Sequence, residues 1–132
     1  MCGFAGFVDR TGRWSPENLS ASARAMAATL AHRGPDSAGD WVDAAAGVAI
    51  GHRRLAFLEL SDKGHQPMVS PSGRYVIAYN GEVYNFRELR AELEAAGDRF
   101  RGHSDTEVVL AAIERWGLAA ALARFVGMFA FA

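Results

Sequence analysis

Segments with strand-like and helix-like patterns alternate in blocks along this chain of 132 residues. Residues 2–8 alternate apolar and small side chains, which predicts a buried strand. Residues 15–17, Ser-Pro-Glu, supply an N-cap, a first-turn proline and an acid, and apolar side chains follow at helical spacing. We therefore expect a helix over about residues 16–31. Such alternation of elements indicates an α+β domain built in layers.

The middle of the chain has mainly extended patterns. Residues 32–36 predict a loop, and residues 48–50 and about 52–58 predict strands around Gly51. A Pro-Ser-Gly turn at 71–73 separates two extended runs, of which the second covers residues 75–79. Residues 127–132 predict a buried strand, and a natural domain rarely ends on an apolar strand with an open edge. We therefore expect this sequence to be a fragment of a longer protein.

Capping signals and apolar stripes predict helices in the second half of the chain. The residues that would cap or end them are Asn85, Glu88, Gly97, Ser104, Glu107 and Gly117. The pair Ser104 and Glu107 is the stronger capping box, and it predicts a helix over about residues 105–116. Residues 118–125 predict a short third helix.

Composition excludes several classes of protein. Half of the residues are hydrophobic and 22% are charged, which is typical of one globular domain. The net charge of -1 predicts neither nucleic acid nor an acidic membrane as a partner. A single cysteine cannot form an internal disulfide, and no signal peptide or membrane-spanning stretch is visible, so we expect a cytoplasmic location. The four histidines lack metal-ligand spacing, so no metal site is predicted.

That single cysteine is the second residue, Cys2. If Met1 is removed, one residue carries both a thiol and a free α-amine, whose ordinary pKa is about 8. A nucleophile and a general base then occupy the same residue. The alternative is a buried structural cysteine in an apolar first strand, and for an isolated cysteine that alternative is the more common one.

Four further polar features accompany Cys2: the loop 33–36, Arg54, the segment 80–82 and Asp105. Each has a structural alternative. Asn-Gly at 80–81 is the usual signature of a type I′ hairpin turn. Asp105 at a helix N-terminus is favoured by the helix dipole whatever the function, and Arg54 could be a solvated strand residue.

Taken together, these residues fit one chemistry. Attack of a thiolate on an amide creates an oxyanion, and the Asn80 side chain and the Gly81 backbone N–H are the types of donor that stabilise it. Arg54 can hold an α-carboxylate and Asp105 an α-ammonium. This combination indicates free glutamine as the substrate.

The sequence resembles the glutaminase domain of class II glutamine amidotransferases, which are N-terminal nucleophile hydrolases. Within that class it is most similar to the domain of glutamine-hydrolysing asparagine synthetases. The resemblance covers essentially the whole chain, residues 1–132, as one domain. The motifs that carry it, in chain order, are Cys2-Gly3, His32-Arg33-Gly34-Pro35-Asp36, Gly51-His52-Arg53-Arg54-Leu55, Gly64-His65-Gln66-Pro67-Met68, Tyr79-Asn80-Gly81-Glu82-Val83-Tyr84-Asn85 and Ser104-Asp105-Thr106-Glu107.

The resemblance implies a four-layer αββα sandwich with mainly antiparallel sheets, incomplete in this chain. It implies Cys2 as nucleophile with its α-amine as base, Asn80 and Gly81 as the oxyanion hole, and Arg54 and Asp105 as the anchors of glutamine. The remaining residues that it assigns to the pocket are Leu55, Phe57, Leu58 and Glu82.

The resemblance also implies partners and cofactors. It requires no cofactor in this domain and assigns ATP and magnesium to a separate C-terminal synthetase domain, which would receive the ammonia to make asparagine. An incomplete sandwich would leave strand edges open, so we expect low stability or a homo-oligomer. The alternatives are a catalytically silent binding or assembly module, and an amidotransferase with an acceptor other than aspartate.

Overall fold

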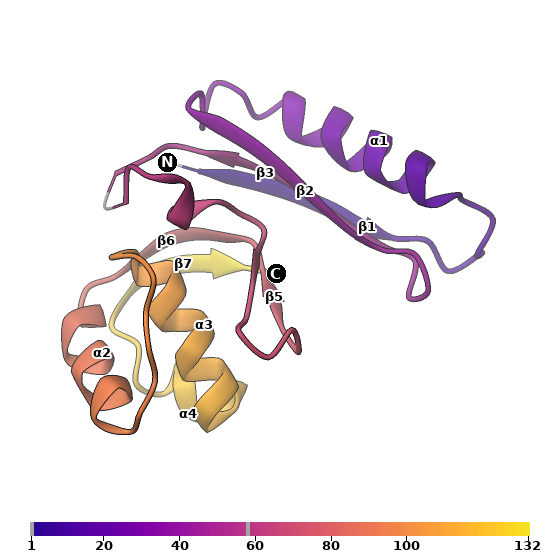
Figure 1. The fold of residues 1–132 in the computed structure, drawn as a ribbon. Helices are drawn as coiled ribbons and strands as arrows, with labels where there is room; N and C mark the ends of the chain where they lie inside the picture. The colour runs from indigo at the N-terminus through magenta and orange to yellow at the C-terminus, as the bar shows by residue number, and fades with distance from the viewer. Residues whose placement is uncertain (1, 58) are drawn as a thin grey trace.

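The computed structural model describes residues 2–57 and 59–132 of the chain. Its first half is a helix on a three-stranded antiparallel sheet of order β1-β3-β2. The elements are β1 (Gly3–Val8), α1 (Pro16–Ala28), β2 (Ser37–Asp43) and β3 (Val48–Arg54). Helix α1 covers one face of this sheet (Figure 1). The predicted pocket residue Leu58 lies outside the described residues.

Small side chains let α1 approach the sheet closely. Leu19 and Ala23 of α1 are buried against Ala49 of β3. A Cβ on Gly51 would lie 2.3 Å from the Ala23 carbonyl oxygen, so no larger residue fits there without moving the helix. Because side chains alternate along a strand, Ala49 and Gly51 face α1, whereas His52 and Arg54 of the same strand face the opposite way.

The second half of the chain forms a two-stranded antiparallel sheet with helices packed on it. The sheet pairs β6 (Tyr79–Val83) with β7 (Gly127–Phe131). The helices are α2 (Phe86–Ala95), α3 (Asp105–Trp116) and α4 (Leu118–Leu122). A short hairpin of β4 (Met68–Val69) and β5 (Val76–Ile77), preceded by the 3-10 turn η1 (Asp62–Gly64), joins the halves. The buried core of this half consists mainly of large aliphatic side chains from α2, α3 and β6.

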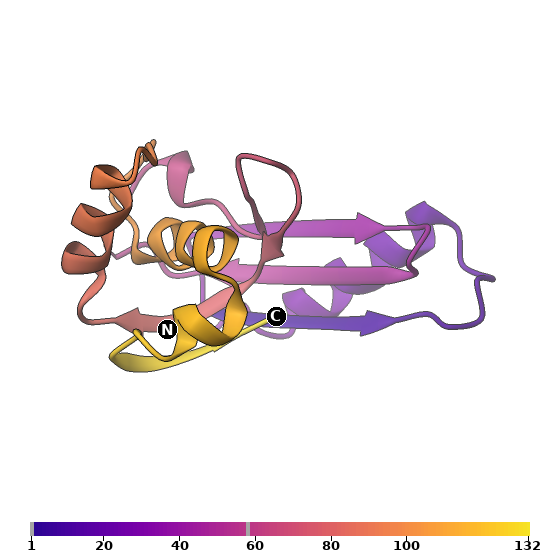
Figure 2. The same cartoon turned by 90° about the horizontal axis from the view of Figure 1, so that it is seen from below.

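The layers follow in the order helix, sheet, sheet, helices (Figure 1). The antiparallel sheets and mixed elements confirm the predicted α+β sandwich of the N-terminal nucleophile hydrolase type. Figures 1 and 2 both show the long strands of the first sheet extending well beyond β6 and β7. The sheets therefore overlap mainly at the end where β1 begins and β3 ends.

Several local predictions were wrong. Strand β2 was not predicted, and the described residues 48–57 hold one strand, which ends at Arg54. Helix α1 ends at Ala28, three residues early, and α4 ends at Leu122. Strands β1 and β7 exist as predicted, but they are not buried strands, since Val8 is 59% and Met128 73% exposed.

The cap of α2 also differs from its prediction. The helix begins after Asn85, but the Asn85 side chain makes no cap hydrogen bond. Its amide instead donates to the Arg124 carbonyl oxygen (2.9 Å) and accepts from the Val126 N–H (3.0 Å). It thereby ties the end of β6 to the segment that enters β7. By contrast, Ser104 caps α3 as predicted, accepting from the Glu107 N–H at 3.2 Å. The predicted capping box is only half formed, because the Glu107 carboxylate accepts from the Arg101 and Gly102 N–H groups.

Candidate active site

The pairing of β1 with β3 brings Cys2 to the end of β3. The register sets Gly3 opposite Arg53, so the preceding residue, Cys2, lies beside the chain that leaves β3. The Leu55 N–H donates to Cys2 Sγ at 3.4 Å, and the thiol donates to the Leu55 carbonyl oxygen at 3.6 Å. Cys2 is half-buried, so the thiol is held by backbone and still reachable.

The loop 33–36 is hydrogen-bonded both to Cys2 and to the chain at the end of β3. Arg33 Nε donates to the Cys2 carbonyl oxygen at 3.1 Å. Asp36 accepts from the Ala56 N–H at 2.7 Å, and its own N–H donates to the Arg54 carbonyl oxygen at 3.0 Å. A Cβ on Gly34 would lie 2.4 Å from the backbone of β3, so the loop needs a glycine at this contact. The loop therefore fixes both Cys2 and the segment that follows β3.

Arg54 is buried, which rules out the solvated alternative. Its Nη1 donates to the Ser61 carbonyl oxygen at 3.0 Å, and its Nη2 donates to the Glu59 carbonyl oxygen. The neighbouring Arg53 points to the α1 side of the sheet, where its Nε donates to the Gly34 carbonyl oxygen at 2.8 Å. Strand alternation thus decides which of the two arginines enters the space between the sheets.

Asp105 is buried at the first position of α3. Its Oδ2 accepts from the Tyr79 hydroxyl (3.0 Å) and the Val83 N–H (3.1 Å), and its Oδ1 accepts from the Thr106 N–H (2.9 Å). Burial raises the pKa of this carboxyl, and the hydrogen bonds oppose that rise. Burial and the nearby Asp105 also raise the pKa of Tyr79, which therefore remains a donor.

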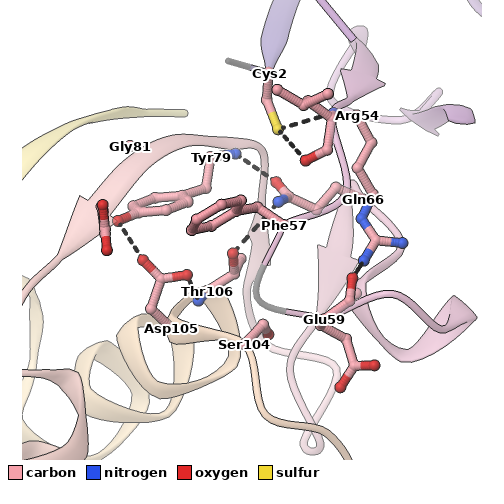
Figure 3. A pocket seen from close by; sticks show the side chains of 13 residues that line it. Cys2, Arg54, Phe57, Glu59, Gln66, Tyr79, Gly81, Ser104, Asp105 and Thr106 are labelled. Atoms are coloured by element: carbon pink, nitrogen blue, oxygen red, sulfur yellow. Dashed lines mark hydrogen bonds between the residues drawn. The ribbon is translucent and has the colours of Figure 1, made fainter. Parts of the chain in front are cut away.

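These groups line one pocket of about 100 Å³ (Figure 3). That volume exceeds the roughly 10–15 Å³ that one water needs, so it admits a small ligand. The predicted residues that line it are Cys2, Arg54, Leu55, Phe57, Gly81, Glu82 and Asp105. The further lining residues are Glu59, Gly64, Gln66, Tyr79, Ser104 and Thr106.

The predicted oxyanion pair lies on β6. Asn80 and Gly81 pair with Ala130 and Phe129 of β7, so the alternative of a hairpin turn at 80–81 is wrong. A Cβ on Gly81 would lie 2.4 Å from the Met128 carbonyl oxygen, which explains the glycine. Asn80 is not a lining residue. Since Tyr79 is buried in the core of the helical layer, alternation along β6 turns Asn80 toward the other sheet, formed by β1, β3 and β2.

Sequence reasoning did not assign a role to Gln66. This buried amide accepts from the Tyr79 N–H at 2.6 Å and donates to Thr106 Oγ1 at 3.4 Å. It therefore links the start of β6 to the start of α3 inside the pocket. The motif 64–68 was the signal that could have found it, although that motif does not say which side chain faces the site.

Glu59 was also missed. Its carboxylate accepts from Ser61 Oγ (2.6 Å), the Ser61 N–H (3.0 Å) and the His103 N–H (2.9 Å). The hydrogen bonds from Ser61, then the one from His103, lower the pKa of Glu59 to about 2. No local sequence pattern could predict the contact between Glu59 and His103, because the two residues are far apart in the sequence.

Comparison with known proteins agrees with this geometry. A family model described as a glutamine amidotransferase domain matches residues 1–132. The chain belongs to this family. It is 40% identical, over 99% of its length, to glutamine-hydrolysing asparagine synthetase 1 of Bacillus subtilis. It is also 40% identical to asparagine synthetase 3 of that organism over 88% of its length, and 34% identical to amidase chry2 of Gibberella zeae over 99%.

The chain spans about a fifth of the length of these curated relatives: 20%, 18% and 20%. The part of each relative that corresponds to this chain is thus an amidotransferase domain within a much larger protein.

His52 lies between the two sheets of this amidotransferase domain. It is fully buried, and its Nε2 contacts the Tyr79 carbonyl oxygen at 3.1 Å. Because that oxygen only accepts, Nε2 carries the proton and Nδ1 is the bare nitrogen, which has no hydrogen-bond partner among residues 2–57 and 59–132. Burial lowers the pKa of His52, so the ring is neutral at pH 7.

The described residues contain no group of three or more His, Cys, Asp or Glu side chains arranged to hold a metal ion. Within the same residues, no helix has the length and apolar character needed to span a membrane.

Proposed function

We propose that this domain hydrolyses L-glutamine to glutamate and ammonia through a thioester on Cys2. The α-amine of Cys2, freed by removal of Met1, takes the thiol proton as Sγ bonds to the side-chain amide carbon of glutamine. The resulting ammonium gives its proton to the leaving nitrogen, the C–N bond breaks, and ammonia departs. Water then adds to the thioester, the C–S bond breaks, and glutamate and the free thiol are released.

The observation that carries this proposal is the composition of one pocket. A half-buried thiol, a buried guanidinium and a buried carboxylate line the same small cavity, although they come from the residue before β1, from β3 and from α3. A free amino acid brings a carboxylate and an ammonium on one carbon, so it complements Arg54 and Asp105 together. The reactive amide at the far end of glutamine then meets Cys2.

In this mechanism the Asn80 side chain and the Gly81 N–H stabilise the tetrahedral oxyanion. Loss of one such donor typically raises a barrier by about 3 kcal/mol. Leu55, Phe57 and Glu82 complete the walls of the glutamine site. The position of Cys2 depends on hydrogen bonds from the Leu55 backbone and from Arg33, and the thiol lines the pocket.

We further propose that the ammonia is used for asparagine synthesis in a longer protein, with ATP, magnesium and aspartate bound outside these 132 residues. The names of the Bacillus subtilis relatives support this proposal. A second candidate is an amide transfer to another acceptor, and the relative named amidase chry2 is the observation that favours it. Product analysis with aspartate and with other carboxylic acids separates the two.

The proposed hydrolysis is tested by glutamate release from L-glutamine. Protein whose mass proves removal of Met1 should turn over glutamine, whereas protein that still carries Met1 should not, because its Cys2 nitrogen is an amide and cannot accept a proton. A matched Cys2→Ala variant should be inactive in either state. Equal turnover with and without Met1 would refute the role of the α-amine.

A further inference from the structure

One loop contact joins the two regions that carry the anchors of glutamine. Arg54 ends β3, and Asp105 begins α3. Glu59, in the loop that follows β3, accepts a hydrogen bond through Oε2 from the His103 N–H at 2.9 Å. His103 lies directly before Ser104, the residue that caps α3. The Glu59 carboxylate therefore ties the loop next to one anchor to the loop next to the other.

The Glu59 carboxylate also stabilises the turn to which the Arg54 side chain is hydrogen-bonded. Its Oε1 accepts from the N–H (3.0 Å) and the hydroxyl (2.6 Å) of Ser61, which closes the turn 59–61. The two terminal nitrogens of the Arg54 guanidinium donate hydrogen bonds to the carbonyl oxygens of Glu59 and Ser61, at the two ends of that turn. Figure 3 shows Arg54 directed at this turn and away from Cys2.

Three successive backbone N–H groups directly before Ser104, the cap of α3, donate hydrogen bonds to side-chain carboxylates. Glu107 accepts from the N–H groups of Arg101 (2.8 Å) and Gly102 (2.9 Å), and Glu59 takes the next one, from His103. A Cβ on Gly102 would lie 2.8 Å from Glu59 Oε2, so this approach suits a glycine. Hydrogen bonds to an ionised acceptor are roughly twice as strong as neutral ones, so the loop is firmly held.

We propose that Glu59 is a positioning residue for glutamine, which holds Arg54 and Asp105 at the separation that the two charged groups of one amino acid require. This inference rests on the proposed function, from which it takes the roles of the two anchors. The α-carboxylate and α-ammonium of glutamine share one carbon, so their spacing cannot adapt to a displaced anchor. The side chain of Glu59 bonds to Ser61 and His103, so it affects binding and not the chemical step.

Binding of L-glutamine by calorimetry tests this role without turnover. The calorimetry uses the full-length protein, from which Met1 has been removed and in which Cys2 is replaced by alanine. Glu59→Gln keeps the size of the side chain but sets an NH₂ group against one of the N–H donors, so Kd should rise about tenfold. Glu59→Asp retains the carboxylate and should recover part of the affinity.

Glu92→Gln is the matched control. It removes an acid whose ion pair with Arg124 (2.6 Å) lies in the helical layer, away from the pocket. This variant should leave Kd unchanged. Amide hydrogen exchange adds a direct readout, since the His103 N–H should exchange faster in Glu59→Gln and at the unchanged rate in Glu92→Gln.

Steady-state kinetics with Cys2 present separates positioning from loss of structure. A positioning role predicts that Glu59→Gln raises KM about tenfold with kcat within about twofold, whereas a smaller folded fraction lowers kcat and leaves KM unchanged. An unchanged Kd, an unchanged His103 exchange rate, or a fall in kcat alone would each overturn the inference. Absence of glutamine binding to the Cys2→Ala parent would instead overturn the proposed function, and the inference with it.

Discussion

The two halves of the domain contribute to the pocket in different ways. The N-terminal half has a thin buried core of Leu19, Ala23 and Ala49, whereas the C-terminal half packs large aliphatic side chains such as Leu93 and Val108. The first half brings the thiol and the buried arginine, and the second brings the β6 backbone and the buried aspartate. We infer that the C-terminal half supplies most of the free energy of unfolding. Activity depends on how the two halves are positioned relative to each other.

Asp105→Asn should have the largest effect and should separate activity from stability. Loss of the charge that we propose binds the α-ammonium should lower kcat/KM for glutamine about 10³-fold, or roughly 4 kcal/mol. Stability at pH 7 should change little, because two effects oppose each other. Burial raises the folded pKa of Asp105, so its ionisation opposes folding as pH rises above the ordinary value, whereas the amide sets an NH₂ group against a backbone N–H donor.

Asp98→Asn is the control, because Asp98 pairs with Arg115 on the surface of the helical layer (2.5 Å). It should leave kcat/KM unchanged. Glutaminase assays and urea unfolding measure both quantities, and a large loss of stability in Asp105→Asn would show that this carboxylate is mainly structural.

Core truncations compare the halves directly. Leu93→Ala should lower the free energy of unfolding by about 3–5 kcal/mol, because Leu93 is fully enclosed in the larger core. Leu19→Ala should cost about 2–3 kcal/mol, since the thin layer beneath α1 can collapse around the space. Urea unfolding of both variants measures the difference, and a larger cost for Leu19→Ala would reverse the comparison.

Arg33→Gln tests alignment within the N-terminal half. It removes the donor to the Cys2 carbonyl oxygen, so the thiol should lose its fixed position and kcat should fall about 30-fold, or roughly 2 kcal/mol. Arg24→Gln, which removes a long ion pair (3.8 Å) between Arg24 of α1 and Asp40 of β2, should leave kcat unchanged. A stopped assay of glutamate release distinguishes them, and equal kcat values would contradict the role given to Arg33.

The smallest effect concerns His52, between the two halves. Burial lowers its folded pKa below the ordinary 6.5, so the unfolded chain binds more protons and stability falls as pH decreases from about 6.5 toward the folded pKa. His52→Gln can keep the donor to Tyr79 and should flatten that dependence. Thermal unfolding between pH 5 and 8 tests this. Identical pH profiles for the wild type and the variant would show that His52 does not cause the pH dependence of stability.

Elements with strong local signals were predictable from the sequence. Ser15 and Ser104 accept the predicted cap hydrogen bonds and the helices begin where expected. Strand β2 was missed because Gly39 and two aspartates interrupt its alternation. Asn80-Gly81 has the local pattern of a turn, and only pairing with the distant strand β7 makes it part of a strand.

The pocket could be predicted in part. The motifs indicated the residues that we propose to react with and anchor glutamine, because the proposed chemistry dictates those residue types. The contacts of Glu59 with His103 and of Gln66 with Tyr79 and Thr106 depend on how the loops pack. Gln66 lies in the motif 64–68, but that motif does not say which side chain faces the site, and Glu59 lies in no motif. Sequence reasoning therefore found the predicted anchors of the substrate but not the side chains that hold them in place.

The central claim is that Cys2 is an N-terminal nucleophile in a glutamine pocket. Its most direct test is the intact mass of the protein after incubation with an electrophilic glutamine analogue, with Cys2→Ala as the control. The account predicts loss of Met1 and one adduct, which excess L-glutamine prevents and Cys2→Ala lacks. A processed protein that gains no adduct, or a Cys2→Ala variant that gains the same one, would contradict the claim.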